Sequence, residues 1–327
     1  MTTLTLSKAL NEGLRKALEA DPKALIMGED VGKLGGVFRV TDGLQKDFGE
    51  ARVIDTPLAE SGIIGTAIGL ALRGYRPICE IQFDGFVFPA FDQIVTQLAK
   101  MRYRSLGTVR LPVTIRIPFG GGIGAVEHHS ESPEALFAHT PGLRVVSCGG
   151  PADAYAMIQQ AAACDDPVVF FEPKRRYWDR ADVDIEGGLA AALPMESAHV
   201  LVPGTDVTML CYGPMVRTCA ETAVAAAADG RSIEVIDLRS LAPLDTETIF
   251  ASVRKTGRCV VVHEAVVTGG IGAEIAAQVT QECFYNLEAP VLRVGAYTTP
   301  YPPSRLEDHY LPDLDRILDA VDRMFSY

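Results

Sequence analysis

The sequence predicts an α/β fold of two parallel-sheet domains. Short apolar segments of strand length alternate with longer segments of helix length along most of the chain. Several strand segments, including 24–28 and 167–173, are continuous apolar runs, which is typical of strands in a parallel sheet covered on both faces. The alternation lapses once, in a stretch rich in charge, glycine and alanine, and then resumes. We therefore place the first domain at residues 1–180, a linker at 181–203 and the second domain at 204–327.

The elements of the first domain follow from apolar runs and from residues that start helices. Its expected strands are apolar and cover 24–28, 52–56, 76–83, 112–118, 143–147 and 167–173. Its expected helices cover 7–20, 61–74, 89–104, 133–139 and 151–164. Ser7 and Ser132 are expected N-caps, because a serine hydroxyl accepts a hydrogen bond from the free N–H groups of the first turn. Pro133 at the first helical position strengthens the second of these predictions.

The second domain repeats the alternation on a smaller scale. Its expected strands cover 206–212, 232–238, 258–264 and 289–294. Its expected helices cover 215–228, 246–254 and 271–282. Each strand but the last is followed by a helix, which predicts a second parallel sheet.

Composition and charge exclude several functional classes. The chain is 48% hydrophobic with a net charge of −12, so a broad surface for nucleic acid or an anionic membrane is not expected. Its seven cysteines are scattered and form no C-x-x-C pair, which favours reduced thiols over a disulfide framework. The first residues show no apolar signal core, and no apolar run approaches the ~18 residues that cross a bilayer. We expect a cytoplasmic protein.

Glu60 is the first candidate for chemistry. It stands where an expected strand gives way to an expected helix. Open α/β sheets bind ligands at the carboxyl ends of their strands, so the position favours a partly buried carboxylate that shares a proton with a ligand nitrogen. The alternative is a structural carboxylate stabilised by the helix dipole. Ser61, Gly65 and Gly69 repeat at four-residue spacing in the same helix, which predicts a face that another protein helix approaches closely.

Three of the six histidines lie within residues 127–139, EHHSESPEALFAH. The neighbours His128 and His129 point in opposite directions on an extended segment, and no ligand pair accompanies them, so a zinc site is not expected. His129 precedes the expected helix start, where the positive end of the dipole favours a neutral imidazole that can hydrogen-bond a substrate oxygen. A capping or surface histidine is the alternative. His139, in the last helical turn, is expected to be a favourable cation there.

Two glycine-rich stretches resemble nucleotide-binding loops only in part. GGGIGAVE (120–127) and GGIGAEI (269–275) both lack the third glycine of G-x-G-x-x-G, and only the second opens an expected helix. Neither carries the lysine and hydroxyl residue of a P-loop. We do not interpret either stretch as a nucleotide site.

Longer stretches carry a resemblance along nearly the whole chain. They are TPLAESGIIGTAIGLALRG, EIQFDGFVFPAFDQIVTQLAK, HHSESPEALFAHTPGLRVV and VVFFEPK in the first domain, and IEVIDLRSLAPLD, KTGRCVVVHEAVVTGGIGAEIA and ECFYNLEAPVLRVGAYTTPYP in the second. In this order they resemble the β subunit of thiamine-diphosphate-dependent 2-oxoacid dehydrogenases. The pieces EIQF, FPAFDQI and FFEPK favour the branched-chain 2-oxoacid (3-methyl-2-oxobutanoate) branch over the pyruvate branch.

The resemblance implies a fold, a partner and a reaction. It implies a transketolase-like pyrimidine-binding domain followed by a transketolase C-terminal domain. It also implies an α2β2 heterotetramer with thiamine diphosphate between the α and β subunits. The implied reaction is oxidative decarboxylation of a 2-oxoacid, with reductive acylation of a lipoyl group on a dihydrolipoyl acyltransferase.

The resemblance also assigns roles to individual residues. Glu60 matches the glutamate that hydrogen-bonds the aminopyrimidine ring of the cofactor and promotes its imino tautomer. Leu58, Gln82 and Phe86 match positions of the pyrimidine pocket. His129 matches the histidine that assists the intermediate and its transfer to lipoyl, whereas His128 occupies a variable position.

Members of this family often bind a monovalent cation, such as K⁺, through main-chain carbonyl groups. The matching positions are Val113, Thr114, Ala161, Cys164 and Asp166. Cys164 and Asp166 depart from the side chains expected there.

One expected motif is missing from the chain. The family pattern that binds the diphosphate and Mg²⁺ begins with G-D-G, and this sequence contains no G-D-G. The resemblance therefore implies that the α subunit holds Mg²⁺ and the diphosphate, and that the chain is active only with that partner. The alternatives are the same chemistry on pyruvate or acetoin, a non-catalytic scaffold subunit, and a nucleotide-dependent reductase on a Rossmann-like fold.

Overall fold

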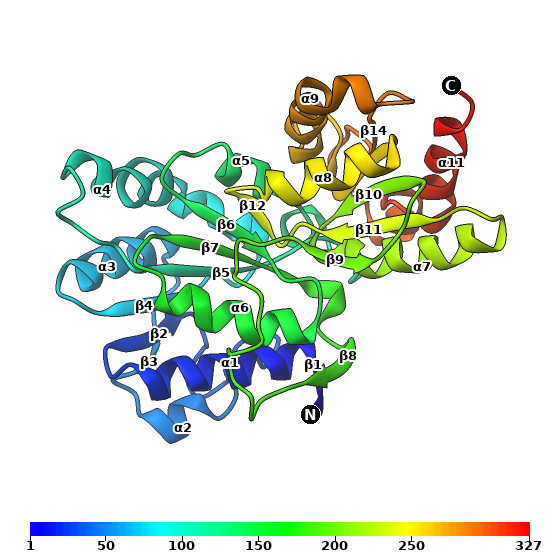
Figure 1. Cartoon of the computed structure of the whole chain (residues 1–327). Helices are drawn as coiled ribbons and strands as arrows, with labels where there is room; N and C mark the ends of the chain where they lie inside the picture. Colours follow the sequence, from blue (N-terminus) through cyan, green and yellow to red (C-terminus); the bar gives the residue numbers. More distant parts are fainter.

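The computed structural model describes residues 1–327, which fold into two α/β lobes (Figure 1). The larger lobe contains a seven-stranded sheet in the order β12-β6-β7-β5-β4-β2-β3. Its strands are β2 (Ala24–Gly28), β3 (Val53–Asp55), β4 (Arg76–Glu80), β5 (Thr114–Phe119), β6 (Arg144–Ser147), β7 (Val168–Pro173) and β12 (Ser240–Ala242). All neighbouring strands are parallel except β12, which runs antiparallel to β6.

Helices cover both faces of this sheet because its strands present apolar side chains on both sides. On one face, α1 (Leu6–Ala20), α2 (Leu44–Phe48) and α6 (Pro151–Ala163) share a core with strand residues such as Ile26 and Phe170. The opposite face is covered by α3 (Glu60–Leu72), the 3-10 helix η1 (Asp84–Ala90), the π-helix η2 (Gln93–Leu98), α4 (Ala99–Arg104) and α5 (Glu134–Ala138). The larger lobe is thus a three-layer sandwich, as its continuous apolar strands predict.

The smaller lobe repeats this architecture with five strands in the order β14-β13-β10-β11-β9. They are β9 (His199–Val202), β10 (Val207–Cys211), β11 (Ile233–Asp237), β13 (Cys259–Val266) and β14 (Leu292–Ala296), and only β9 runs antiparallel to its neighbour. One face packs against α7 (Val216–Ala228) and α11 (Leu314–Met324), and the other against α8 (Thr246–Thr256) and α9 (Ile271–Cys283). The predicted fold of two parallel-sheet α/β units is confirmed.

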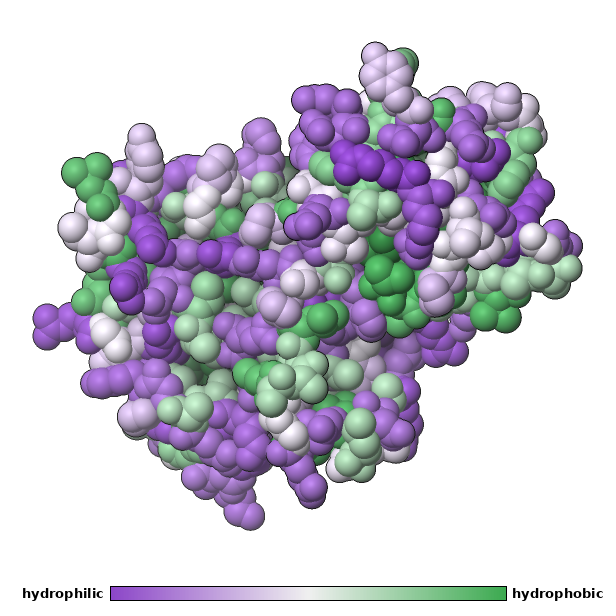
Figure 2. Space-filling view, in the orientation of Figure 1, coloured by the Kyte–Doolittle hydropathy of each residue, from purple (hydrophilic) through white to green (hydrophobic).

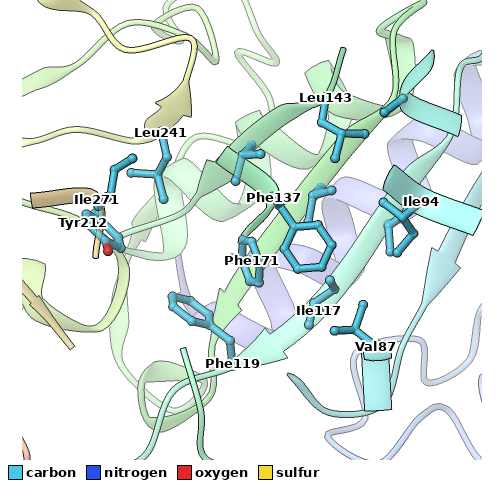
Figure 3. Packing of buried hydrophobic residues seen from close by; sticks show 14 of the residues in the cluster. Val87, Ile94, Ile117, Phe119, Phe137, Leu143, Phe171, Tyr212, Leu241 and Ile271 are labelled. Carbon is cyan, nitrogen blue, oxygen red and sulfur yellow. The ribbon is translucent and has the colours of Figure 1, made fainter. Parts of the chain in front are cut away.

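The two lobes share one hydrophobic core. The largest cluster holds 38 buried residues and includes strands and helices of both lobes. Figure 3 shows Phe137 and Phe171 of the larger lobe in the same interior as Tyr212 and Ile271 of the smaller one. Because β12 follows β11 in sequence but pairs with β6 of the larger lobe, the backbone also ties the lobes together. We conclude that the lobes form one packed unit.

The segment that we assigned to the linker contains regular structure. β8 (Arg180–Val183) pairs antiparallel with β1 (Thr2–Thr5), and β9 forms the edge of the smaller sheet. Each of these three strands has only four residues, most of them partly exposed. β1 and β8 show no apolar run, and the run in β9 is only three residues long, from Val200 to Val202. Long-range pairing, rather than local propensity, forms these strands.

The predictions for two helices before residue 105 were wrong. The expected helix 89–104 is divided, because η1 ends at Ala90 and the helix that follows widens into η2 before α4 begins. Helix α1 begins one residue earlier than expected, and Thr5 rather than Ser7 caps it, with its hydroxyl accepting a hydrogen bond from the Lys8 amide. Because strand β1, which was not predicted, ends at Thr5, the helix begins directly after it and Thr5 becomes the N-cap.

The surface and the thiols agree with the composition. Figure 2 shows hydrophilic residues over most of one face, with apolar residues in small groups between them. None of the helices has the length and apolarity that crossing a membrane requires. All seven cysteines are unpaired, and six of them are buried.

Candidate active site

Polar and aromatic side chains gather where the strands of the larger sheet end. Because β2, β3, β4, β5 and β7 are parallel, their carboxyl ends lie along one edge of the sheet. Glu29, Gln82 and Lys174 follow the ends of β2, β4 and β7 by one or two residues, and Glu60 follows β3 by five. His129 lies ten residues after β5. Helix α3 packs against η1, and η1 packs against the short 3-10 helix η3 (Glu127–His129). The three elements α3, η1 and η3, which carry Glu60, Phe86 and His129, are therefore in contact one after the other.

Glu60 begins helix α3 and is 8% exposed, yet no protein group hydrogen-bonds its carboxylate. Another acid, Glu29, lies within electrostatic reach of Glu60 and is also buried. Burial raises the pKa of Glu29, and the negative charge of Glu60 raises it further. A buried carboxylate without a partner is costly, and proximity to a second acid adds to that cost. The pair is thus suited to accept a hydrogen bond or a proton from a ligand.

The other residues assigned to the pyrimidine pocket lie at different depths. Gln82 is half-buried and its side-chain amide donates a long hydrogen bond to the carbonyl oxygen of Glu29, at 3.4 Å. Phe86 lies in η1 and its ring is half-buried. Leu58 is 79% exposed in the turn before α3. Gln82 and Glu60 both border Glu29, whereas Leu58 offers an apolar surface at the outer rim.

His129 is held by aromatic contacts rather than by hydrogen bonds to its ring. Its imidazole packs edge-on against Phe83 and Phe86, with ring centroids 4.2 and 5.1 Å apart, respectively. Its Nδ1 atom is buried and has no hydrogen-bond partner. Burial lowers the pKa of His129 below its ordinary value, and the neighbouring cationic positions His128 and Lys174 lower it further. His129 is therefore suited to act as a neutral hydrogen-bonding group.

The neutral state of His129 was predicted, but for a different reason. Pro133 occupies the cap position of α5 instead of the first helical position, and Ser132 does not cap the helix. Helix α5 has only five residues, so its dipole is a weak source of positive potential. Burial of the ring is the main cause. His128 is exposed and contacts the ring of His129, with centroids 4.4 Å apart.

The positions assigned to a monovalent cation lie at the amino-terminal ends of β5 and β7 and at the end of α6, where most of their polar groups already have protein partners. The carbonyl of Val113 accepts a hydrogen bond from Val168 at 2.9 Å, and that of Ala161 accepts one from Cys164 at 3.1 Å. Thr114 is buried at the start of β5. The carbonyl groups of Val113 and Ala161 thus already accept backbone hydrogen bonds, one at the start of β7 and one at the end of α6.

Arginines engage the remaining groups of this region. Arg144 donates to the Asp166 carboxylate at 3.1 Å, and Arg102 forms a second ion pair with it. Arg76 donates to the carbonyl oxygen of Cys164, also at 3.1 Å. Guanidinium groups thus supply the positive charge here, and the geometry does not fit an open cation cage.

A third group of charges lies in the middle of the same sheet. Arg116 of β5 forms two hydrogen bonds to Glu172 of β7, at 2.6 and 2.9 Å, and one to Glu80 of β4, at 2.6 Å. Tyr177 donates a further bond to Glu172 at 2.6 Å. The side chains of the three charged residues are at most 6% exposed. This cluster is internally satisfied, in contrast to Glu29 and Glu60.

Sequence reasoning missed Glu29 and Phe83. Glu29 directly follows the buried run of β2, at the same type of position as the other candidates, and that position was the available signal. Phe83 lies in the stretch EIQFDGFVFPAFDQIVTQLAK, where no local pattern separates it from the other three phenylalanines before Asp92. No group of three or more His, Cys, Asp or Glu side chains in the chain could hold a metal ion.

Comparison with known proteins identifies the two lobes. Residues 2–178 match the pyrimidine binding domain of transketolase, and residues 196–317 match the transketolase C-terminal domain. The chain is 60% identical over 325 residues to the pyruvate dehydrogenase E1 component subunit beta of Leifsonia xyli, covering 99% of this chain and 96% of that protein. It is 54% identical over 323 residues to the 3-methyl-2-oxobutanoate dehydrogenase subunit beta of Mycobacterium tuberculosis, covering 98% and 92%, respectively.

A solved structure supports the same fold. A split-gene transketolase, described as an inactive beta4 tetramer, superposes with a TM-score of 0.82. The match covers 99% of this chain and 98% of that one at 24% sequence identity. At this identity the likeness extends to the fold.

Proposed function

This chain belongs to the transketolase-like E1 β-subunit family of the 2-oxoacid dehydrogenases, and from that premise we propose that it acts in oxidative decarboxylation of a branched-chain 2-oxoacid. The single observation that carries the proposal is Glu60, a buried carboxylate without a protein partner at the carboxyl edge of the pyrimidine-domain sheet. Such a group has the chemistry that a pyrimidine ring nitrogen needs.

The cofactor that fits is thiamine diphosphate, which supplies the electron sink for decarboxylation when it is bound. Glu60 would hold the pyrimidine ring through a hydrogen bond to a ring nitrogen and move a proton at that atom. Phe86 and Leu58 would cover the ring from the apolar side, and Gln82 would border it beside Glu29. Since Glu29 and Glu60 repel each other while both are charged, a proton on either one relieves a cost already present in the fold.

His129 would act on the substrate side of the site. Its lowered pKa keeps the imidazole neutral near pH 7, so it can hydrogen-bond a substrate oxygen and assist transfer of the acyl group to lipoyl. Phe83 and Phe86 give the ring an apolar, water-poor surround on two sides. We propose a lipoylated dihydrolipoyl acyltransferase as the acceptor.

An α subunit would complete the site in an α2β2 heterotetramer. Of the small residues that repeat at four-residue spacing along α3, Ser61 and Gly69 are exposed and Gly65 is half-buried, and the exposed side chain of Leu58 lies just before the helix. This face admits a close-packed helix from another chain. Because no acidic or histidine cluster suited to a metal is present in this chain, we assign Mg²⁺ and the diphosphate to the α partner. Cofactor binding by the chain alone with Mg²⁺, as tight as in the assembled enzyme, would overturn this assignment.

The proposal also has to name the 2-oxoacid that the enzyme accepts. The sequence pieces EIQF, FPAFDQI and FFEPK favour 3-methyl-2-oxobutanoate, and a relative named for that acid is 54% identical. The 60% identical relative, named for pyruvate, makes pyruvate the second candidate. The experiment is carbon dioxide release by the chain reconstituted with its α partner, thiamine diphosphate and Mg²⁺, on each of the two acids. We expect a higher kcat/KM for the branched acid. A higher value for pyruvate would move the protein to the other branch and leave the roles of Glu60 and His129 in place.

A further inference from the structure

We propose that Asp84 and Lys174 are positioning residues that fix the backbone around His129 and thereby place its imidazole. The inference rests on the proposed role of His129. Asp84 is the first residue of η1, and Lys174 directly follows β7. Their side chains form an ion pair with 0% exposure for both partners, immediately beneath the His129 segment.

Besides bonding to each other, Asp84 and Lys174 each form a hydrogen bond to a backbone group of that segment. Lys174 Nζ donates to the carbonyl oxygen of His129 at 2.6 Å as well as to Asp84. The second carboxylate oxygen of Asp84 accepts a hydrogen bond from the Glu131 amide, also at 2.6 Å. One buried pair therefore holds the chain on both sides of the peptide units that join His129 to Glu131.

The energetics of the pair favour a positioning role over a purely stabilising one. Burial raises the pKa of Asp84 to about 6 and lowers that of Lys174, so burial opposes the charged form of both partners. A buried ion pair often contributes no more to stability than well-packed apolar residues of the same size. Apolar residues could not hydrogen-bond the two backbone groups, and that is what this pair adds.

The same short segment also holds the imidazole itself. A Cβ atom on Gly85 would lie 2.4 Å from the carbonyl oxygen of His128, so the backbones of η1 and η3 are in direct contact there. Phe83 and Phe86, on either side of Asp84 and Gly85, support the two sides of the His129 ring. Since Nδ1 of that ring has no hydrogen-bond partner, only the backbone anchors and the aromatic contacts set its position.

The test uses the chain assembled with its α partner and compares two steps, decarboxylation and acylation of a lipoyl domain. The variants are Lys174→Met and the double variant Asp84→Asn with Lys174→Met, which leaves no unpaired charge. Displacing a reacting group by about 1 Å can lower a rate about 100-fold, so we expect acylation to fall about 10-fold to 100-fold, with cofactor affinity changed less than about 2-fold. Lys255→Met is the matched control, because it removes a lysine paired with Glu234 in the smaller lobe.

A structural role and a positioning role differ in a double-mutant cycle. If Lys174 acts through His129, adding Lys174→Met to His129→Ala should lower acylation by less than about 2-fold beyond His129→Ala alone. Independent, multiplying losses would overturn the proposal. Hydrogen–deuterium exchange gives a readout apart from activity: the peptide 125–135 should exchange faster in Lys174→Met than in Lys255→Met, and unchanged exchange would contradict the proposal.

Two further outcomes keep this proposal separate from the proposed function. If His129→Ala leaves acylation unchanged, the role of His129 is wrong and the positioning proposal falls with it. If His129→Ala impairs acylation while the folded double variant does not, the role of His129 stands and the positioning proposal alone is overturned. Should Lys174→Met fail to fold, Asp84→Asn alone carries the test. The asparagine side chain has one oxygen where Asp84 has two, so it cannot accept hydrogen bonds from both Lys174 and the Glu131 amide in the same way. One of the two backbone anchors is then lost, and acylation should still fall.

Discussion

Two groups of buried carboxylates in the larger lobe differ in a way that separates structure from function. Glu80 and Glu172 flank Arg116 in the middle of the sheet, and both accept hydrogen bonds from its guanidinium group. Glu29 and Glu60 lie at the edge of the same sheet with no cation beside them. The first group has its partners inside this chain. The second group is left for a partner that comes from outside, which is the pattern expected at a ligand site.

The largest effect on stability should come from breaking the satisfied group. Arg116→Met would leave Glu80 and Glu172 buried without a cation, and removing one partner of a buried ion pair costs about 3–5 kcal/mol. Urea unfolding followed by circular dichroism measures this loss. The control is Arg217→Met, an exposed arginine paired with Glu221, for which we expect less than about 0.5 kcal/mol. Equal losses of unfolding free energy in both variants would show that the buried ion pairs of Arg116 contribute no more to stability than an exposed pair.

An intermediate effect is expected at Glu134, a buried carboxylate with one neutral partner. Tyr212 donates to its Oε1 atom at 2.5 Å, while Oε2 has no partner. Burial raises the pKa of Glu134 from an ordinary value of 4.5 to about 7. The folded state thus holds a proton that the unfolded state releases, so this group's contribution to stability is lost as pH rises from about 4.5 to about 7.

Glu134→Gln tests this pH dependence. The amide keeps an oxygen for Tyr212 but does not titrate, so the variant should gain about 1–3 kcal/mol relative to the wild type between pH 4.5 and 7. Unfolding free energies of both proteins at several pH values across this window measure the gain. A constant difference at every pH would mean that Glu134 is not protonated in the folded state near neutrality.

The smallest effect is expected where arginines already engage the carboxylate. Asp166 is paired with Arg102 and Arg144, and Arg76 donates to the nearby carbonyl of Cys164. We therefore expect the same thermal unfolding midpoint in K⁺ as in Na⁺ at equal ionic strength. A higher midpoint in K⁺ alone would show that a cation displaces these contacts, and would support the site assigned at Val113, Thr114, Ala161, Cys164 and Asp166.

Local sequence pattern predicted the core of the fold but not its cross-connections. Continuous apolar runs identified β2, β5 and β7 because a strand buried on both faces carries that pattern wherever it occurs. β12 did not stand out, because its three residues pair with a strand almost a hundred positions earlier. Its place depends on the packing of the two lobes, which no local pattern encodes.

The candidate site divides in the same way. Glu60 was predicted to lie near the carboxyl end of a strand, and it follows β3 by five residues, because a strand end is visible in the sequence. His129 was placed only relative to the start of an expected helix, and its role stays a prediction. The pair of Asp84 and Lys174 was not anticipated, since 90 residues separate its members and only the parallel sheet brings them together. The lowered pKa of His129 was predicted in direction, but its main cause is burial of the ring, a tertiary effect.

The most direct test of the contrast between the two groups is Glu60→Gln, measured in both stability and turnover. Because the Glu60 carboxylate has no protein partner and repels Glu29, we expect the unfolding free energy to stay within about 0.5 kcal/mol of the wild-type value or to rise. A positioned proton-transfer group contributes about 10²-fold to 10⁴-fold, so carbon dioxide release by the assembled enzyme should fall by at least about 100-fold. A large loss of stability, or turnover near the wild-type rate, would contradict the assignment of Glu60 to the cofactor.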